Sequence, residues 1–239
     1  MQNKQIKSIR TPKLFIPLSF VLFLLTYLYP VNSFISRTLF LISFLALWLS
    51  PWISGIKSKT LMTVQILFSL IVMGFYFVPN FDEDLDFLKK SYLNNLKSFE
   101  KTRYVWGGAN FVGIDCSGLP RKAYIKALFK NGFSKFESTC IRDSIELWWY
   151  DSSAKALKEN YRSYTETVEQ NISIKNYDTE IGDLAITSDG VHVIIYLGEH
   201  QWIHADPYAG NVIIEDSRTS KNIWFRQTFD VVRWSLFCE

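Results

Sequence analysis

The chain has 239 residues and a formal net charge of +3, but this charge is the sum of two unlike parts. Residues 1–79 hold seven Lys or Arg and no Asp or Glu, so all 23 acidic side chains fall in residues 80–239. Residues 80–239 also hold 19 Lys or Arg, so their net charge is −4. Because a nucleic-acid site needs Lys and Arg gathered on one face, a charge this close to zero argues against a nucleic-acid partner.

Three apolar runs occupy the N-terminal third, at residues 14–31, 38–56 and 60–79. Each is uncharged and close to the ~20 residues that a helix needs to cross a ~30 Å hydrocarbon core. A cleavable signal peptide is the alternative for the first run, but no small-x-small site follows it and two further runs do. Residues 1–79 are therefore predicted to form a transmembrane region of about three helices in a lipid bilayer.

Two groups of basic residues flank these apolar runs, one before the first run and one between the second and third. The group before the first run consists of Lys4, Lys7, Arg10 and Lys13, and the group between the second and third consists of Lys57 and Lys59. The positive-inside rule assigns both groups to the cytoplasm, against the single Arg37 in the first outer loop. Three crossings then place residues 80–239 outside the cytoplasm, with an inward-facing domain as the alternative.

An amphipathic pattern follows Pro79. Apolar side chains recur at steps of three and four, at Leu85, Leu88, Tyr92, Leu96 and Phe99. This spacing predicts one helix within a connecting segment, residues 80–103, with its apolar stripe packed on the domain that follows. That domain is assigned to residues 104–239.

The domain opens with a glycine-rich stretch, YVWGGANFVGIDCSGL at residues 104–119. Cys116 stands at the start of a predicted helix, where the helix dipole favours the thiolate and lowers the thiol pKa. The glycines and the polar neighbours Asp115 and Ser117 indicate an exposed thiol. A buried structural cysteine is the alternative.

The predicted helix runs from Cys116 through SGLPRKAYIKALFKNG. Pro120 falls in its first turn, where a missing N–H removes no helical hydrogen bond. Asn131 and Gly132 are read as the signal that ends the helix.

Three histidines are available as a base for a cysteine nucleophile: His192, His200 and His204. Alternation predicts a strand at residues 191–198 and another at 201–205, joined as a hairpin with His200 in the turn as a solvated residue. Further strands are expected at residues 181–187, 211–216 and 229–236. A helix carrying the cysteine, followed by an antiparallel sheet carrying the histidines, is an α+β arrangement.

The spacing of the cysteines and the absence of cofactor motifs argue against a metal site, a disulfide framework and a bound cofactor. No two cysteines are spaced as C-x-x-C, which argues against a zinc site and a disulfide framework. If two cysteines pair, Cys140 and Cys238 are the candidates. The sequence has no H-E-x-x-H, no P-loop and no dinucleotide fingerprint, so we expect neither a metal nor a cofactor.

Three ordered motifs, YVWGGANFVGIDCSGL, GDLAIT and HVIIYLGEHQWIHA, resemble those of the NlpC/P60 cysteine peptidases, papain-like enzymes of bacterial cell-wall metabolism. The resemblance covers roughly residues 85–236. It implies a papain-like α+β fold with Cys116 as nucleophile, His192 as general base and His204 as the residue that orients the base.

The same resemblance implies a substrate cleft at the glycine-rich stretch. Tyr104 would lie near the developing oxyanion, Asp115 would face the amino end of the substrate, and Ser117 would flank the nucleophile. The backbone N–H of Cys116 is a further candidate oxyanion donor, because donors at a helix N-terminus point outward.

The implied substrate is the peptidoglycan stem peptide, cut between D-glutamate and the diamino acid. With the membrane region, this predicts a multi-pass protein of the bacterial cytoplasmic membrane whose catalytic domain faces the periplasm or cell wall. Two alternatives remain open: a Cys/His amidase or acyl hydrolase on another substrate, and a wall-binding scaffold without catalysis.

The sequence departs from the family pattern at two places. Pro120 replaces an aliphatic residue after C-S-G-L, and residues 133–175 match none of the shared motifs. This region includes the aromatic residues Trp148, Trp149 and Tyr150, which are interpreted as core or, alternatively, as one wall of the substrate groove. Wall-binding repeats are absent, which leaves the choice of bond open.

Overall fold

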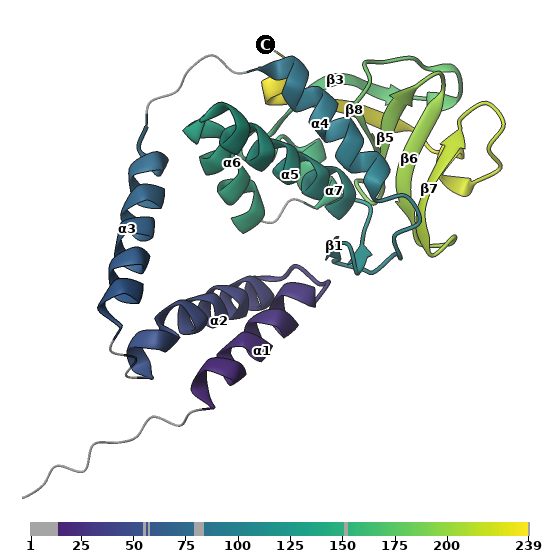
Figure 1. Ribbon diagram of the computed structural model, residues 1–239. Coiled ribbons are helices and arrows are strands. Elements are labelled where there is room, and N and C mark those ends of the chain that lie inside the picture. Colours follow the sequence, from purple (N-terminus) through teal and green to yellow (C-terminus); the bar gives the residue numbers. More distant parts are fainter. Residues whose placement is uncertain (1–13, 55, 57, 79–83, 151–152, 239) are drawn as a thin grey trace, which may run out of the picture. The chain divides into compact units, whose positions relative to one another are not determined.

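The computed structural model describes residues 14–54, 56, 58–78, 84–150 and 153–238 (Figure 1). The chain forms two compact units, Met1–Tyr29 with Phe34–Met73 and Pro30–Ser33 with Gly74–Glu239. Most of the basic residues that predict the orientation, at positions 4, 7, 10, 13 and 57, lie outside the described residues.

An α-helix covers most of each apolar run: α1 Phe15–Leu28, α2 Phe34–Ile53 and α3 Lys59–Tyr76, with α2 beginning four residues before its run. Helices α2 and α3, with 20 and 18 residues, are long and apolar enough to cross a membrane. Helix α1 has 14 residues and rises about 21 Å, which is less than a hydrocarbon core of ~30 Å. The number of spans therefore stays a prediction.

Polar side chains join the apolar helices. The hydroxyls of Thr26 in α1 and Ser43 in α2 lie 2.9 Å apart. Gln65 in α3 donates to the carbonyl of Trp48 at 2.9 Å and accepts from the indole of Trp52 at 2.8 Å. Such bonds are a common means of helix association in lipid. Arg37, expected in a loop, lies inside α2, because no helix-breaking residue separates it from Phe34.

The second unit is built on a six-stranded antiparallel sheet with the order β3-β8-β4-β5-β6-β7. Its strands are β3 Thr165–Ile172, β4 Leu184–Thr187, β5 Val193–Gly198, β6 Gln201–Asp206, β7 Asn211–Asp216 and β8 Phe229–Trp234. All five expected strands are present. Strand β3 was missed because it is an edge strand with polar side chains exposed on both faces, so it has no apolar alternation.

Helices α4 Leu85–Ser98, α5 Gly118–Lys135 and α6 Ser138–Trp149, with the short α7 Ala154–Lys158, gather beside one face of the sheet (Figure 1). The predicted stripe of α4 is buried there, and Leu88, Tyr92 and Leu96 have no exposed surface. Strand residues such as Val193 and Ile195 complete this core. Because side chains alternate along a strand, Ile194 and Trp202 form a second core on the opposite face, with the short helix Ile223–Arg226.

The predicted stop at Asn131 and Gly132 is wrong, because α5 continues to Lys135 and ends at Phe136, whose φ is 58°. Asn131 is buried inside the helix and donates to the Glu137 carboxylate at 2.7 Å. A Cβ on Gly132 would lie 2.6 Å from the Ile141 side chain. The two residues therefore serve the close packing of α5 on α6.

Candidate active site

The loop before Cys116 is organised by one carboxylate. Asp115 accepts hydrogen bonds from the backbone N–H of Gly107 at 2.9 Å and of Gly118 at 2.5 Å, and from the Ser117 hydroxyl at 3.1 Å. The loop also contains the small hairpin of β1 Ala109–Asn110 and β2 Gly113–Ile114. Asp115 thus ties the glycine turn to the first turn of α5 and holds Cys116 between them.

Two glycines allow this loop to fold so tightly. A Cβ on Gly118 would lie 2.2 Å from the carbonyl oxygen of Gly108, and a Cβ on Gly108 would lie 2.6 Å from that of Gly113. Both contacts are to backbone atoms, which cannot move aside as a flexible side chain can. No residue with a side chain fits at either position without distorting the loop.

Cys116 is buried, with 8% of its surface exposed, so the expectation of an exposed thiol is wrong. Its Sγ donates to the carbonyl of Val191 at 3.6 Å, next to His192 in the chain. Burial, and then the charge of Asp115, raise the pKa of the thiol to about 12. Backbone N–H groups, including that of Val193, act in the opposite direction but are outweighed.

His192, immediately before β5, and His204, in β6, face each other. Nε2 of His192 lies 2.9 Å from Nδ1 of His204, and both rings are buried. Burial, with a smaller effect of His204, holds the pKa of His192 well below the usual value for histidine. At neutral pH Cys116 is therefore a thiol and His192 a neutral imidazole, because burial outweighs the lowering of the thiol pKa that was expected from the helix dipole.

Two further side chains complete the histidine pair, and neither was predicted. Nε2 of His204 lies 3.1 Å from the carboxylate of Glu215 in β7. The indole of Trp224 stacks on His192, with ring centroids 4.0 Å apart and planes inclined by 13°. The register of β6 and β7 pairs His204 with Ile213, so alternation makes Glu215 a diagonal neighbour of His204 on the same face. This register is seen only in the structure, so Glu215 could not be identified from the sequence.

The residues expected to line the substrate cleft lie around Cys116. Tyr104 is half-buried, and its pKa is raised by burial and then by the charges that Cys116, Asp115 and Asp206 carry when they are ionised. Ser117 is the residue immediately before α5. Both oxygens of Asp115 accept hydrogen bonds within the loop, so the carboxylate is held in place there, and its contact with a substrate stays a prediction.

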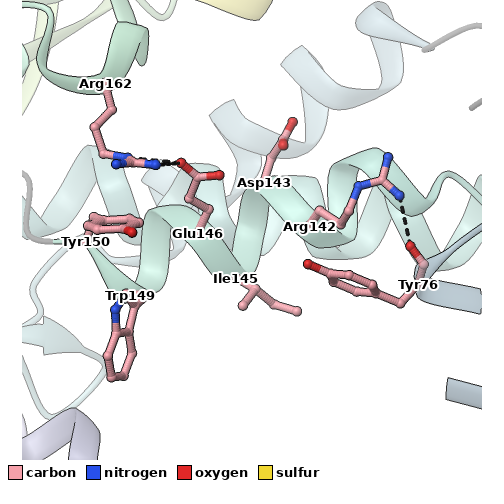
Figure 2. Close-up of a pocket in the computed structure, with 8 residues that line it drawn as sticks. All are labelled: Tyr76, Arg142, Asp143, Ile145, Glu146, Trp149, Tyr150 and Arg162. Carbon is pink, nitrogen blue, oxygen red and sulfur yellow. Dashed lines mark hydrogen bonds and ion pairs between the residues drawn. The ribbon is translucent and has the colours of Figure 1, made fainter. Parts of the chain in front are cut away.

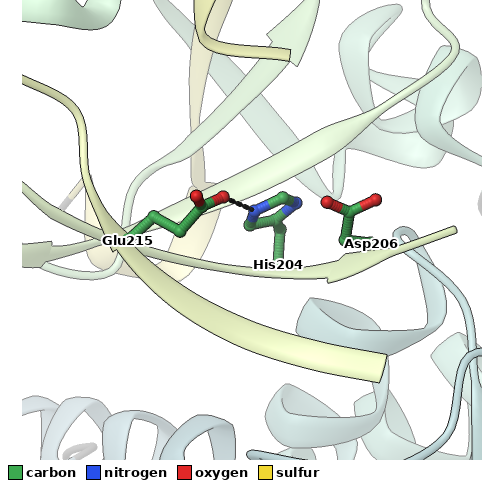
Figure 3. Close-up of side chains that lie close together, drawn as sticks. All are labelled: His204, Asp206 and Glu215. Carbon is green, nitrogen blue, oxygen red and sulfur yellow. Dashed lines mark hydrogen bonds and ion pairs between the residues drawn. The ribbon is translucent and has the colours of Figure 1, made fainter. Parts of the chain in front are cut away.

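His204, Asp206 and Glu215 form a group that could hold a metal ion, since their candidate ligand atoms lie within 4.8 Å of one another (Figure 3). The amide of Asn222, however, donates to Asp206 at 2.5 Å and to Glu215 at 2.8 Å. Nδ1 of His204 is also engaged by His192. These donors satisfy the two carboxylates, and the group fits a hydrogen-bond network better than a set of metal ligands.

A pocket of about 380 Å³ lies elsewhere in the second unit, along α6 (Figure 2). None of Cys116, His192 and His204 lines it. Trp149 and Tyr150 do, and with Trp148 they are half-buried, so this aromatic cluster is not full core, and the alternative that it forms one wall of the substrate groove stays a prediction.

Cys116, Cys140 and Cys238 are all free thiols in the structure. Cys140 is buried in α6, where it donates to the Glu137 carboxylate at 3.4 Å, whereas Cys238 is exposed near the chain end. The pairing considered for Cys140 and Cys238 is not formed.

Comparison with known proteins identifies the domain. The model of the NlpC/P60 family matches residues 101–233. Among solved structures, the chain is similar to the peptidoglycan hydrolase RipB of Mycobacterium tuberculosis, at 21% identity over 62% of this chain and 64% of that chain, with a TM-score of 0.39. It is also similar to NlpC1 of Trichomonas vaginalis, at 19% identity over 62% and 44% of the two chains, with a TM-score of 0.39.

A third similar structure is the NlpC/P60 domain of the peptidoglycan hydrolase SagA, at 24% identity over 60% and 97% of the two chains, with a TM-score of 0.37. No curated protein matches the chain. The chain spans less than two thirds of the length of RipB and of NlpC1.

Proposed function

Because the chain belongs to the NlpC/P60 family, we propose that it is a membrane-anchored cysteine peptidase that hydrolyses an amide bond in peptidoglycan stem peptides. One observation carries this proposal. The loop before α5 holds the Cys116 thiol against Val191, the neighbour of His192, and His192 is in turn held by His204. These contacts support the proposal that Cys116, His192 and His204, from separate segments, act together as nucleophile, base and orienting group.

In the proposed mechanism, catalysis starts from two neutral groups. His192 takes the thiol proton as Sγ of Cys116 attacks the scissile carbonyl, and the imidazolium gives that proton to the leaving amine. A thioester to Cys116 remains. His192 then activates a water, which releases the carboxylic acid and restores the thiol.

The imidazolium that forms on His192 needs support, because burial disfavours a charged ring. The stacked indole of Trp224 supplies it through a cation–π interaction, which strengthens when the ring becomes charged. His204 accepts a hydrogen bond from the same ring, and the charge of Glu215 lies beyond it.

The developing oxyanion is assigned to donors at the start of α5. The backbone N–H of Cys116 is one proposed donor, and the Tyr104 hydroxyl is the other. Burial and nearby negative charge raise the pKa of Tyr104, so its hydroxyl keeps its proton at neutral pH. Asp115 and Ser117 are proposed to shape the cleft, chiefly by holding the loop that presents Cys116.

The connection between α1 and α2 supports the proposed outward orientation. Pro30–Ser33 belongs to the same unit as the catalytic residues. The backbone N–H of Asn32 donates to Gly107 at 2.7 Å, and that of Ala109 donates to Pro30 at 2.9 Å. This connection and the active-site loop must therefore face the same side of the membrane, which the positive-inside rule assigns to the exterior.

The bond that we propose is the one between D-glutamate and the diamino acid. The test is to incubate the detergent-solubilised full chain with purified peptidoglycan and to identify the fragments by mass spectrometry. The full chain is required because Pro30–Ser33 completes the catalytic unit. New termini at another amide would replace the proposed bond, and tight binding without fragments would favour a scaffold.

A further inference from the structure

His204 uses both of its ring nitrogens. Nδ1 lies 2.9 Å from Nε2 of His192, and Nε2 lies 3.1 Å from Oε2 of Glu215. Figure 3 shows the Glu215 carboxylate directed at the ring, with Asp206 on the other side and not bonded to it. The imidazole has no exposed surface, so solvent reaches neither nitrogen.

Glu215 is held in place from two further directions. The Ser220 hydroxyl donates to Oε1 at 3.0 Å, and the Asn222 amide donates to Oε2 at 2.8 Å. The hydrogen bond with His204, together with these two, holds the pKa of Glu215 below its usual value. The group is therefore a carboxylate at neutral pH, and a carboxylate can only accept hydrogen bonds.

These contacts determine where the protons lie. Since Glu215 only accepts, Nε2 of a neutral His204 carries the hydrogen and Nδ1 is bare. The bare Nδ1 must then accept from Nε2 of His192, which leaves Nδ1 of a neutral His192 without a proton. Nδ1 is therefore the nitrogen of His192 that can take the proton of the Cys116 thiol.

We propose that Glu215 is a positioning residue that selects the tautomers of His204 and His192 and thereby keeps the base ready for Cys116. The inference rests on the proposed function, because it concerns how the proposed base is prepared. Without Glu215, His204 can place its proton on Nδ1 and donate to His192. His192 then carries its own proton on Nδ1, where it cannot accept one from the thiol.

The tautomers can be measured directly, because the chain has only three histidines. The full chain, labelled with nitrogen-15 histidine and solubilised in detergent, is studied by NMR, and His200→Gln identifies the resonances that do not belong to the pair. The wild type should show protonated Nε2 and bare Nδ1 on both His192 and His204. Glu215→Ala should give a mixture of tautomers on both rings.

Kinetics provide the second measurement. In Glu215→Ala, kcat should fall roughly 100-fold with KM within about twofold, because an outer residue acts through the base and not on substrate binding. Glu215→Gln keeps the shape of the side chain, but its amide can donate as well as accept, so it should show mixed tautomers with a smaller loss. Asp216→Asn is the matched control, since Asp216 pairs with Arg218 at 2.7 Å and should change neither measurement.

Unchanged tautomers in both Glu215 variants would overturn the inference even if activity fell, because the loss would then be structural. A loss equal to that of Asp216→Asn would overturn it as well. If the wild type cleaves no peptidoglycan, the proposed function fails, while the NMR spectra still decide whether Glu215 selects the tautomers.

Discussion

Trp224 lies flat against His192, with ring centroids 4.0 Å apart and an angle of 13° between the planes. A cation–π interaction of this kind contributes about 0.5–2 kcal/mol, which corresponds to roughly a two- to thirtyfold change in rate. Trp224→Leu should therefore lower kcat by about that factor, because the imidazolium loses support when it forms. The steady-state rate on peptidoglycan fragments measures this. Ile223→Leu changes an exposed neighbour and should leave kcat unaltered, and equal rates in both variants would contradict the role of the stack.

The pH dependence of kcat/KM should reflect two neutral catalytic groups. Burial holds the pKa of His192 well below its usual value of about 6.5, so activity should persist at pH 6.5 and be lost only at a clearly lower pH, where His192 becomes protonated. Burial raises the pKa of Cys116 to about 12, so no second limb should appear near pH 8.5. A bell-shaped profile that falls above pH 8.5 would instead indicate a preformed thiolate–imidazolium pair.

The rate of thiol alkylation provides an independent check on the burial and protonation of Cys116. At pH 7 the exposed Cys238 should react with iodoacetamide before Cys116, because burial keeps Cys116 inaccessible and protonated. Peptide mapping after brief treatment gives the order of reaction. Preferential labelling of Cys116 would show that the thiol is more activated than its surroundings predict.

The alternation of apolar residues predicted five strands, and the motifs brought Cys116, His192 and His204 to one place. The burial of Cys116 was not predictable, because it depends on the carbonyl of Val191, a residue 75 positions further along the chain that lies 3.6 Å from the sulfur. Glu215 was missed for a related reason, since its contact with His204 depends on the register of β6 and β7. Contacts between separate segments determine the burial of Cys116 and the position of Glu215, and a pattern within one segment does not predict such contacts.

Gly118→Ala should disrupt the active-site loop. The added Cβ would lie 2.2 Å from the Gly108 carbonyl oxygen, so the backbone must shift at a cost of about 1–3 kcal/mol. The thermal unfolding midpoint should fall, and cleavage should be lost with it. Gly74→Ala is the control, because, beyond its chain neighbours and the backbone of its own helix, its added Cβ meets no described atom within 4 Å. Equal stability of the two variants would contradict the proposed packing of the loop.

The α1–α2 connection should support the loop through its backbone. Asn32→Pro removes the N–H that donates to Gly107 at 2.7 Å, whereas Asn32→Ala keeps it. A lost hydrogen bond of this kind costs about 0.5–1.5 kcal/mol, so only the proline variant should show lower kcat/KM in the full chain. Identical kinetics in the two variants would show that the connection does not act on the site.

The central claim is that Cys116 and His192 form the catalytic pair of a peptidoglycan peptidase. The most direct measurement is the release of stem-peptide fragments by the full chain, compared among the wild type, Cys116→Ala, His192→Ala and His204→Ala. Each of the first two substitutions should abolish cleavage, because removing one member of the pair costs nearly as much as removing both, and His204→Ala should leave residual activity. Wild-type rates in Cys116→Ala would contradict the assignment.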